Sequence, residues 1–352
     1  MVKPEYHIPS MKDINNIKWN GFNVISTFSG CGGSSLGYKM AGFKVLWANE
    51  FIPSAQEVYS LNHPETILNP LDIRTLEPRE ILKTLNIKKY ALDLFDGSPP
   101  CSSFSTVGKG SQYWGQSKKY SSTVQRTDDL FFEYARIVEG IMPKIFVAEN
   151  VSGLVRGKAR GYFIDIIKKL KSIGYNVSCK VLDAQWLGVP QIRNRTIFIG
   201  VRDDFKISPV YPKPFPYRYS VNDALPNLKS KNQSYVIEPE SISFIAPPCY
   251  ANEWEKLKIG ESSEKYYQFQ KINPYKPISA ICATNARAAS QVHPYYKRKF
   301  AIAELKRLSG FPEDFKLTGT YSQQWERIGR AVPPLMMYQV ADTIKRDMLD
   351  CI

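Results

Sequence analysis

Apolar residues in the first part of the chain follow two alternating patterns. Short apolar runs bounded by turn residues are typical of buried strands, and apolar residues three and four positions apart are typical of helices. Strands are predicted over residues 23–28, 44–48, 92–95, 144–148, 176–182 and 196–201, and helices over residues 53–61, 78–85, 130–141 and 162–173. The alternation predicts an α/β fold with a doubly wound, mostly parallel sheet, whose ligands bind at the carboxyl ends of the strands.

The pattern changes at about Asp203, where prolines begin to interrupt every long helical stretch. A chain of 352 residues with 43% apolar residues is long enough for one large and one small domain. We therefore expect a large domain over residues 20–202 and 325–352 and a smaller domain over residues 203–324. The interrupting prolines are Pro209, Pro212, Pro214, Pro216, Pro226, Pro239, Pro247 and Pro248.

The charge of the chain favours a polyanionic partner. The formal net charge is +14, and residues 151–200 alone contain nine Lys or Arg against two Asp or Glu. Such an excess is typical of proteins that bind nucleic acid. The alternative is that the basic side chains serve only solubility.

The cysteines give no sign of a metal site, because they include no CxxC pair and only three histidines could join them. No apolar segment follows Met1, and no run approaches roughly eighteen uninterrupted apolar residues. We therefore expect no membrane span and a cytoplasmic protein. The six cysteines are Cys31, Cys101, Cys179, Cys249, Cys282 and Cys351.

Three separated segments contain residue types suited to attack on an electron-poor ring. A proline pair restricts the backbone before Cys101, Glu149 ends an apolar run, and Arg193 and Arg195 follow later. A thiolate adds readily to such a ring only when a ring nitrogen is protonated at the same time, and cytosine is such a ring. Taken singly, a cysteine is more often a buried structural thiol, and the arginines fit a solvated strand edge equally well. The joint order favours catalysis.

A glycine-rich turn follows the first predicted strand. Gly30-Cys31-Gly32-Gly33 comes after the run Asn23–Phe28, and Glu50 ends the second strand about twenty residues further on, where acidic side chains commonly bind ribose hydroxyls. This pattern suits NAD as well as S-adenosylmethionine. Ser35 stands where a dinucleotide-binding turn has its third glycine or alanine, which disfavours a pyrophosphate ligand.

Taken in order, these segments and others resemble the motifs of the C5-cytosine DNA methyltransferases, from Phe22 to the C-terminal helix. The matching segments are Phe28-Ser29-Gly30-Cys31-Gly32-Gly33, Asn49-Glu50, Pro100-Cys101, Glu149-Asn150-Val151, Gln191 with Arg193 and Arg195, Arg307-Leu308-Ser309-Gly310-Phe311-Pro312 and Gly329-Arg330-Ala331-Val332-Pro333-Pro334.

The resemblance implies a covalent mechanism. Cys101 adds to C6 of a cytosine, Glu149 gives a proton or hydrogen bond to N3, and Arg195 holds O2. After C5 is methylated, loss of its proton expels the cysteine. The expected catalytic residues are Cys101, Glu149, Arg193 and Arg195, and the expected substrate contacts are Pro100, Asn150 and Gln191.

The resemblance also implies S-adenosylmethionine as the cofactor. The expected cofactor contacts are Phe28, Ser29, Gly30, Cys31, Gly32, Gly33, Glu50, Phe51, Asp72, Ile73, Asp96, Gly97, Pro99, Leu130 and Ala331.

Double-stranded DNA is the partner that the resemblance implies, with a monomeric enzyme and a cognate restriction endonuclease or a phage modification role. Residues 203–287 would recognise the target, and residues 285–290 are candidate base contacts, with a simple loop as the alternative. The long polar segment between Ser102 and Asp129 is expected to close over an extruded cytosine. The helix after Pro333 would complete the large domain.

Three positions depart from the family pattern: Ser102 and Ser309 stand where glutamine is frequent, and Arg330 where asparagine is common. Three alternatives remain. An RNA cytosine methyltransferase is disfavoured because the chain lacks the Cys-Phe-Thr tripeptide of that branch. A non-catalytic DNA-binding protein is disfavoured by the intact catalytic residues, and a nicotinamide oxidoreductase by the glycine spacing.

Overall fold

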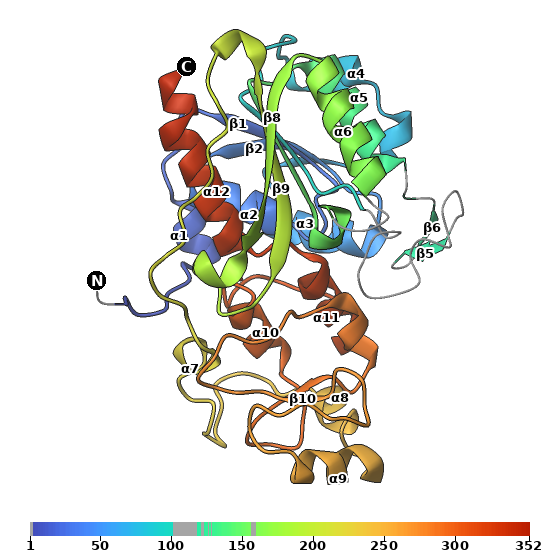
Figure 1. Ribbon diagram of the computed structural model, residues 1–352, viewed down its shortest axis with the longest axis vertical. Coiled ribbons are helices and arrows are strands. Elements are labelled where there is room, and N and C mark those ends of the chain that lie inside the picture. Colours follow the sequence, from blue (N-terminus) through green and yellow to red (C-terminus); the bar gives the residue numbers. More distant parts are fainter. Residues whose placement is uncertain (1–2, 101–117, 121–122, 126, 128, 156–159) are drawn as a thin grey trace. The chain divides into compact units, whose positions relative to one another are not determined.

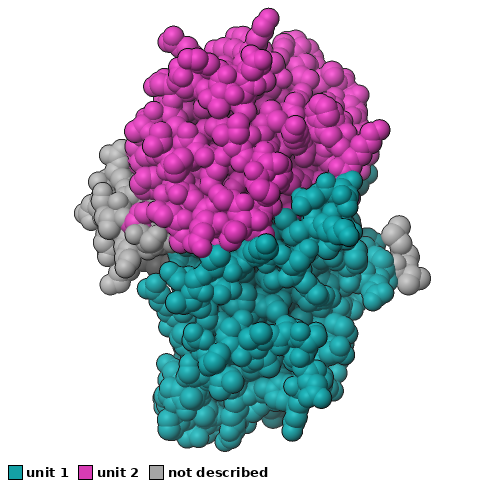
Figure 2. All heavy atoms as spheres, turned by 180° about the vertical axis from the view of Figure 1, so that it is seen from behind, with its two compact units in different colours: residues 1–16, 183–193, 213–336 teal, residues 17–182, 194–212, 337–352 magenta. Residues whose placement is uncertain are grey.

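The computed structural model describes residues 3–100, 118–120, 123–125, 127, 129–155 and 160–352 (Figure 1). The chain forms two compact units. Unit 1 contains residues 1–16, 183–193 and 213–336, and unit 2 contains residues 17–182, 194–212 and 337–352 (Figure 2). Cys101, Ser102 and most of the segment up to Asp129 lie outside the described residues. The expected closure of this segment over DNA therefore stays a prediction.

Unit 2 is built on a seven-stranded sheet. Its strands lie in the order β3 (Ile67–Asn69), β2 (Lys44–Asn49), β1 (Asn23–Thr27), β4 (Leu94–Gly97), β7 (Ile145–Val151), β9 (Asn194–Arg202) and β8 (Tyr175–Asp183). The pairs from β3 across to β7 are parallel, and β9 runs antiparallel to β7. The predicted doubly wound, mostly parallel sheet is confirmed.

The strand order reverses beside β1. The chain passes outward from β1 to β3 and then returns to β4 on the other side of β1. Ligands of such sheets bind at the carboxyl ends of the strands where the order reverses. Thr27 and Gly97 are paired at these two ends, so this edge is where the structure places a candidate site.

Helices flank the sheet of unit 2, and Figure 1 shows α4, α5 and α6 together on one side and α12 on the other. Two predicted helices, 78–85 and 130–141, have the observed bounds, and two others differ by one or two residues at their ends. The strand predicted over 92–95 is shifted to Leu94–Gly97, because pairing with β1 and β7 continues to Gly97. The helices are α2 (Gly33–Met40), α3 (Pro53–Asn62), α4 (Pro78–Leu85), α5 (Leu130–Ile141), α6 (Arg160–Ser172) and α12 (Pro334–Asp347).

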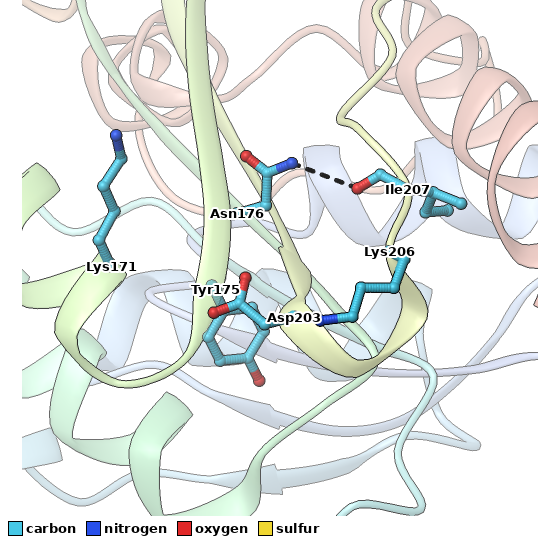
Figure 3. Close-up of a pocket in the computed structure, with 6 residues that line it drawn as sticks. All are labelled: Lys171, Tyr175, Asn176, Asp203, Lys206 and Ile207. Carbon is cyan, nitrogen blue, oxygen red and sulfur yellow. Dashed lines mark hydrogen bonds between the residues drawn. The ribbon is translucent and has the colours of Figure 1, made fainter.

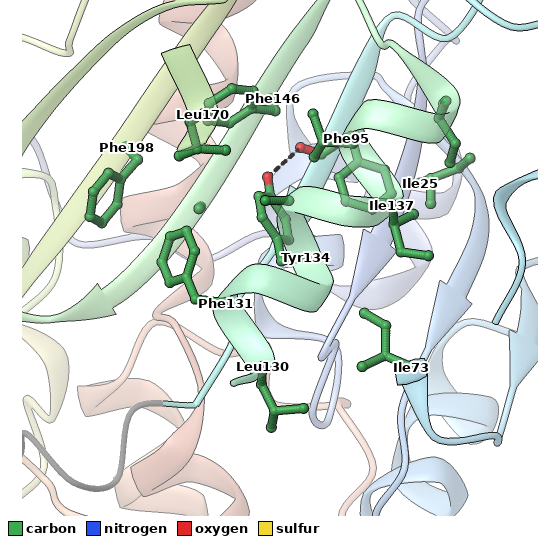
Figure 4. Close-up of a cluster of buried hydrophobic side chains, with 14 of the residues drawn as sticks. Ile25, Ile73, Phe95, Leu130, Phe131, Tyr134, Ile137, Phe146, Leu170 and Phe198 are labelled. Carbon is green, nitrogen blue, oxygen red and sulfur yellow. Dashed lines mark hydrogen bonds between the residues drawn. The ribbon is translucent and has the colours of Figure 1, made fainter. Parts of the chain in front are cut away.

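Aromatic side chains fill the space between α5 and the sheet (Figure 4). The rings of Phe131 and Phe198 lie 5.3 Å apart, centre to centre, in an edge-to-face contact. Tyr134 donates a hydrogen bond of 2.9 Å from its hydroxyl to the Val147 carbonyl. Full burial of one such ring contributes about 1.5–3 kcal/mol, so these contacts hold α5 firmly against β7 and β9.

Unit 1 has less regular structure around a separate core. Ile281, Phe300 and Trp325 are fully buried there. Tyr6, near the chain start, joins this core and donates a 2.7 Å hydrogen bond to the Arg307 carbonyl. Its helices and strands are α1 (Met11–Asn15), α7 (Val221–Ala224), α8 (Pro239–Ser243), α9 (Pro248–Lys256), β10 (Gln270–Lys271), β11 (Gln291–Val292), α10 (Ile302–Leu308) and α11 (Tyr321–Arg330).

The units group residues 1–16 and 183–193 with residues 213–336, whereas the domains predicted from the sequence, 20–202 with 325–352 and 203–324, stay a prediction. In the described ranges no helix is long and apolar enough to cross a bilayer. The remaining short elements are the antiparallel pair β5 (Lys118–Tyr120) and β6 (Thr123–Gln125) and the 3-10 helices η1 (Ile73–Thr75), η4 (Ser152–Val155), η6 (Ala184–Trp186), η7 (Asp203–Phe205), η8 (Ala283–Arg287) and η9 (Leu349–Cys351).

Candidate active site

The turn between β1 and α2 has a backbone that glycine favours. Gly30 and Gly32 have φ angles of +57° and +93°, and Phe28 also adopts a positive φ, +51°. A Cβ atom on Gly32 would overlap the imidazole of His63, so only glycine fits there. Gly32 is also the N-cap of α2 and supplies no side-chain hydrogen bond to it. The positive end of the helix therefore faces this turn.

Glu50 ties the glycine turn to the end of β2. One carboxylate oxygen accepts a 2.7 Å hydrogen bond from the Gly30 amide, and the other accepts one of 2.7 Å from the Ile52 amide. Only 6% of Glu50 is exposed. Each carboxylate oxygen can accept a second hydrogen bond, so Glu50 can hold the turn and still bind a ligand hydroxyl.

Apolar side chains are exposed next to Glu50. Phe51 is 36% exposed and Leu71 is 54% exposed, and the Leu71 carbonyl accepts a 2.8 Å hydrogen bond from the side chain of Asn49 at the end of β2. An exposed aromatic ring of this kind suits stacking against a flat heterocycle. Asp72 follows directly and forms an ion pair with Arg74 at 3.0 Å.

Ile73 and Leu130, two further predicted cofactor contacts, are each 2% exposed and belong to the buried cluster of unit 2 (Figure 4). The side chains of both residues pack in the core. Cys31 is equally buried, at 2% exposed, and Gly33 begins α2. The predicted cofactor contacts of these residues stay predictions.

Asp96, at the end of β4, forms a buried network with β1 and α2. It is 1% exposed and accepts hydrogen bonds from the hydroxyls of Ser26, at 2.9 Å, and Tyr38, at 3.1 Å. Ser29 of the glycine turn donates in turn to the Ser26 carbonyl at 3.0 Å. Burial raises the pKa of Asp96 to about 7. The predicted cofactor contact of Asp96 stays a prediction.

The chain leading to Cys101 runs past the end of β7. Gly97 ends β4, and a Cβ atom there would lie 2.6 Å from Oγ1 of Thr27, so the two strand ends are tightly packed. Asn150 donates a 3.1 Å hydrogen bond from its side chain to the Pro99 carbonyl. This bond fixes the backbone two residues before Cys101, next to Pro100.

Glu149 and Arg195 form an ion pair at this same edge. The Arg195 Nε lies 2.6 Å from a Glu149 carboxylate oxygen, and the two side chains are 16% and 10% exposed. In the antiparallel register Glu149 pairs with Ile197 and Val151 with Arg195, so the two charged residues are diagonal neighbours on one face. The structure thus brings together two of the predicted catalytic residues.

Arg193 and Gln191 belong to unit 1 and contact its backbone. Arg193 is 2% exposed and donates to the carbonyls of Ile281, Gly329 and Ala331 at 2.8–2.9 Å. Gln191, 1% exposed, accepts a 3.1 Å hydrogen bond from the Ile281 amide. A solvated strand edge, the alternative for these arginines, is therefore wrong for Arg193. Its role in the chemistry stays a prediction, as does the cofactor contact of Ala331.

A pocket of about 570 Å³ lies elsewhere in unit 2, where β8 begins and β9 ends (Figure 3). Arg195 lies near the start of β9, so this pocket is at the opposite end of that strand from the candidate active site. It is lined by Lys171, Tyr175, Asn176, Asp203, Lys206 and Ile207.

Sequence reasoning missed Ser26 and Tyr38, which hold Asp96. Ser26 is paired with Asp96 across β1 and β4, but strands that lie about seventy residues apart in the chain become neighbours only once the strand order is known. The two hydroxyl residues at the end of this buried strand, Ser26 and Thr27, were the available signal.

A sheet with this strand order, a glycine turn after β1 and an acidic residue after β2 are consistent with a Rossmann-like methyltransferase fold. A family model for C-5 cytosine-specific DNA methylases matches residues 22–346, and the chain belongs to this family. The protein is therefore a DNA (cytosine-5-)-methyltransferase, as the order of its motifs predicted.

Among similar proteins, the type II methyltransferase M1.HphI of Haemophilus parahaemolyticus is 31% identical over 336 residues, covering 91% of this chain and 86% of the relative. M.NgoPII of Neisseria gonorrhoeae is 28% identical, covering 96% and 99%. A solved Escherichia coli prophage protein described as a DNA modification methyltransferase has a TM-score of 0.75 at 23% identity, covering 94% and 100% of the chains. Dnmt2 of S. pombe has a TM-score of 0.62 at 18% identity, covering 93% and 99%. These structures support the fold.

Proposed function

We propose that the protein methylates C5 of one cytosine within a short sequence of double-stranded DNA, with S-adenosylmethionine as the methyl donor, as the modification enzyme of a type II restriction system. The observation that carries the proposal is the Glu149–Arg195 pair beside the chain that enters Cys101. The type II methyltransferases named among its relatives support the biological role.

The residues around the glycine turn fit S-adenosylmethionine. Glu50 has acceptor capacity for ribose hydroxyls, and the exposed Phe51 ring suits the adenine. The amino end of α2, capped by Gly32 without a side-chain hydrogen bond, suits the carboxylate of the amino-acid part. When bound, this cofactor would supply an electrophilic methyl group carried on a positively charged sulfonium sulfur.

Each catalytic residue then has its own role in the reaction of the cytosine. The Cys101 thiolate forms a bond to C6, and the electrons displaced from the C5–C6 double bond make C5 nucleophilic while N3 takes a proton or hydrogen bond from Glu149. A guanidinium has five N–H donors, so Arg195 can keep its bond to Glu149 and also donate to O2. Loss of the C5 proton after methylation restores the double bond and breaks the sulfur–C6 bond.

DNA must present this cytosine outside the helix, because C6 is attacked from the ring face that stacking covers. The net charge of +14 supports binding to the phosphate backbone. We propose that the enzyme binds DNA as a monomer.

The test is transfer of tritiated methyl groups from S-adenosylmethionine to mixed unmethylated DNA and, separately, to transfer RNA, followed by bisulfite sequencing of the product. Label in DNA at C5 of one short motif is the expected result. Label only in RNA would overturn the substrate assignment. No label in either would favour a DNA-binding protein without catalysis.

A further inference from the structure

Residues 279–291 of unit 1 contain little regular structure beyond η8 and the first residue of β11, yet side chains hold much of their backbone. Gln291 donates to the carbonyls of Ser279 and Ala280 at 2.8 and 3.0 Å. Arg193 donates to the Ile281 carbonyl at 2.9 Å. The entry to η8 is thereby fixed by residues from other parts of the chain.

Helix α11 packs against η8 and holds the same segment from a second direction. Trp325 donates from its indole to the Cys282 carbonyl at 3.1 Å, and Ser322 donates to the Ala286 carbonyl at 3.2 Å. Gly329 lies so close that a Cβ atom there would be 2.6 Å from the Ala283 amide nitrogen. The backbone of η8 therefore has little freedom to move away from α11.

Lys299 completes this support from inside the unit. It is fully buried, and its ammonium donates to the carbonyls of Asn285, at 2.6 Å, and Ala288, at 3.0 Å. The ammonium also lies over three rings, 4.0 Å from the centre of Trp325, 4.4 Å from that of Phe244 and 5.8 Å from that of Tyr321. Within the described part of the chain, the Lys299 ammonium contacts carbonyl oxygens and ring faces rather than a carboxylate.

Burying a lysine in this way is costly. Burial lowers the pKa of Lys299 to about 7, which reflects the cost of keeping its charge out of water. A neutral polar residue could cap two carbonyls at lower cost, so the lysine needs another explanation. By donating to the Asn285 and Ala288 carbonyls, Lys299 fixes the backbone conformation at the end of η8, and we take this to be its role.

Arg287 is the charged residue that this rigid turn presents to solvent. Its neighbours Asn285, Ala286 and Ala289 are buried, whereas Arg287 and Ala288 are exposed. A guanidinium on a fixed backbone loses less freedom when it binds an anion than one on a free loop. The turn therefore suits recognition of a phosphate group.

We propose that Arg287 contacts a phosphate of the bound DNA and that Lys299 is a positioning residue, which fixes the turn that carries Arg287. This inference rests on the proposed DNA substrate and adds a named contact to it. Lys299 itself stays buried and touches no DNA. The two residues should therefore act as one unit in DNA binding.

The experiment measures the dissociation constant for substrate DNA against salt concentration for the wild type, Arg287→Ala, Lys299→Met and the double variant. Arg287→Ala should weaken binding about tenfold and lower the slope of log Kd against log salt by about 0.9. Lys299→Met should give most of the same change, and the double variant little more than Arg287→Ala alone.

Two controls separate this role from a loss of stability or charge. Lys271 is another nearly buried lysine, 3.6 Å from the centre of the Trp254 ring, that donates to the Trp254 and Leu257 carbonyls. Lys271→Met should leave the salt slope unchanged. Lys83 is exposed in the last turn of α4, in unit 2. Lys83→Ala should remove one charge without lowering the slope.

An unchanged salt slope in Arg287→Ala would overturn the phosphate contact, and this variant decides the matter even if Lys299→Met does not fold. If the double variant weakened DNA binding by the product of the two single-variant factors, the two residues would act independently, and the positioning role of Lys299 would be overturned. Methyl transfer to DNA by the wild type is measured in parallel. Its absence would contradict the proposed function, whereas transfer with unaffected variants would contradict only this inference.

Discussion

Two buried carboxyl groups at the edge of the sheet have different partners. A guanidinium holds Glu149, whereas two hydroxyls hold Asp96. Burial raises the pKa of Asp96 and so stabilises its acid form. Asp96 supports the strands beneath the glycine turn through its two hydroxyl partners, whereas Glu149 is the carboxyl group that we propose acts on the substrate.

Asp96→Asn should make the free energy of unfolding depend less on pH. The pKa of Asp96 is raised from 3.8 to about 7, so between these values the folded state holds a proton that the unfolded state has lost. Stability from this residue is then present at low pH and falls as pH rises toward 7. Urea unfolding at pH 5 and at pH 8 measures the free energy of unfolding. Between these two pH values it should fall by a few kcal/mol more in the wild type than in the variant. Equal losses in both proteins would contradict the buried, protonated Asp96.

Glu149→Gln should slow methyl transfer at least about a hundredfold, because a positioned general acid typically contributes that much. Glutamine keeps the size of the side chain but has no acidic proton. Single-turnover rates at saturating DNA and S-adenosylmethionine measure the effect. Glu139→Gln, at an exposed ion pair with Lys169, is the control and should react at the wild-type rate. A Glu149→Gln rate within a few-fold of wild type would refute the proton-donor role.

Helices and strands that have clear signals in their own sequence could be predicted, whereas segments held in place by side chains distant in the chain could not. α4 begins with Pro78 at its first turn and is followed by Asn86 in the left-handed conformation, so its bounds were evident. The apolar period of α5 was equally clear. In unit 1 the Arg193 bond to the Gly329 carbonyl joins residues 136 positions apart, and Tyr6 enters the core from the chain start. No local pattern indicates such contacts.

The same contrast applies to the candidate site. The glycine turn, Glu50 and Glu149 could be identified because each follows a predicted strand, and parallel strands end at one edge. The Glu149–Arg195 pairing depends on the antiparallel register of β7 and β9, which the sequence does not specify. The support from Tyr38 depends on how α2 packs against the sheet.

Gly329→Ala should destabilise unit 1 by about 1–3 kcal/mol, because a methyl group would force η8 away from α11. Chemical denaturation measures the change. Gly161→Ala is the matched control, since no described atom lies within 4 Å of a Cβ atom at that position in α6. It should be neutral or stabilise the protein by up to ~1 kcal/mol. Equal stability of the two variants would contradict the close packing of α11 on η8.

At the scale of the whole molecule, charge and fold point to the same partner. The edge of the sheet carries the proposed cofactor contacts and the proposed catalytic pair, and the net charge of +14 favours a polyanion. Each phosphate contact releases counterions from DNA. Binding of DNA by this protein should therefore depend strongly on salt, whereas a charge excess that serves only solubility predicts weak dependence.

Raising salt from 50 to 200 mM should weaken DNA binding on the order of 10³-fold, the change expected for about six phosphate contacts. Fluorescence anisotropy with a labelled duplex measures it. S-Adenosylmethionine binding over the same range is the control and should change little, because that ligand is small and carries no phosphate. A change in DNA affinity below about tenfold would refute a phosphate-dominated interface.

The most direct test of the covalent mechanism uses DNA with 5-fluorocytosine at the target position. Fluorine at C5 cannot leave as a proton, so the bond between Cys101 and C6 should persist after methylation. Mass spectrometry should detect a protein–DNA adduct on the peptide that contains Cys101 when S-adenosylmethionine is present, and no adduct with Cys101→Ser. Methyl transfer by Cys101→Ser at the wild-type rate, without any adduct in the wild type, would contradict the mechanism.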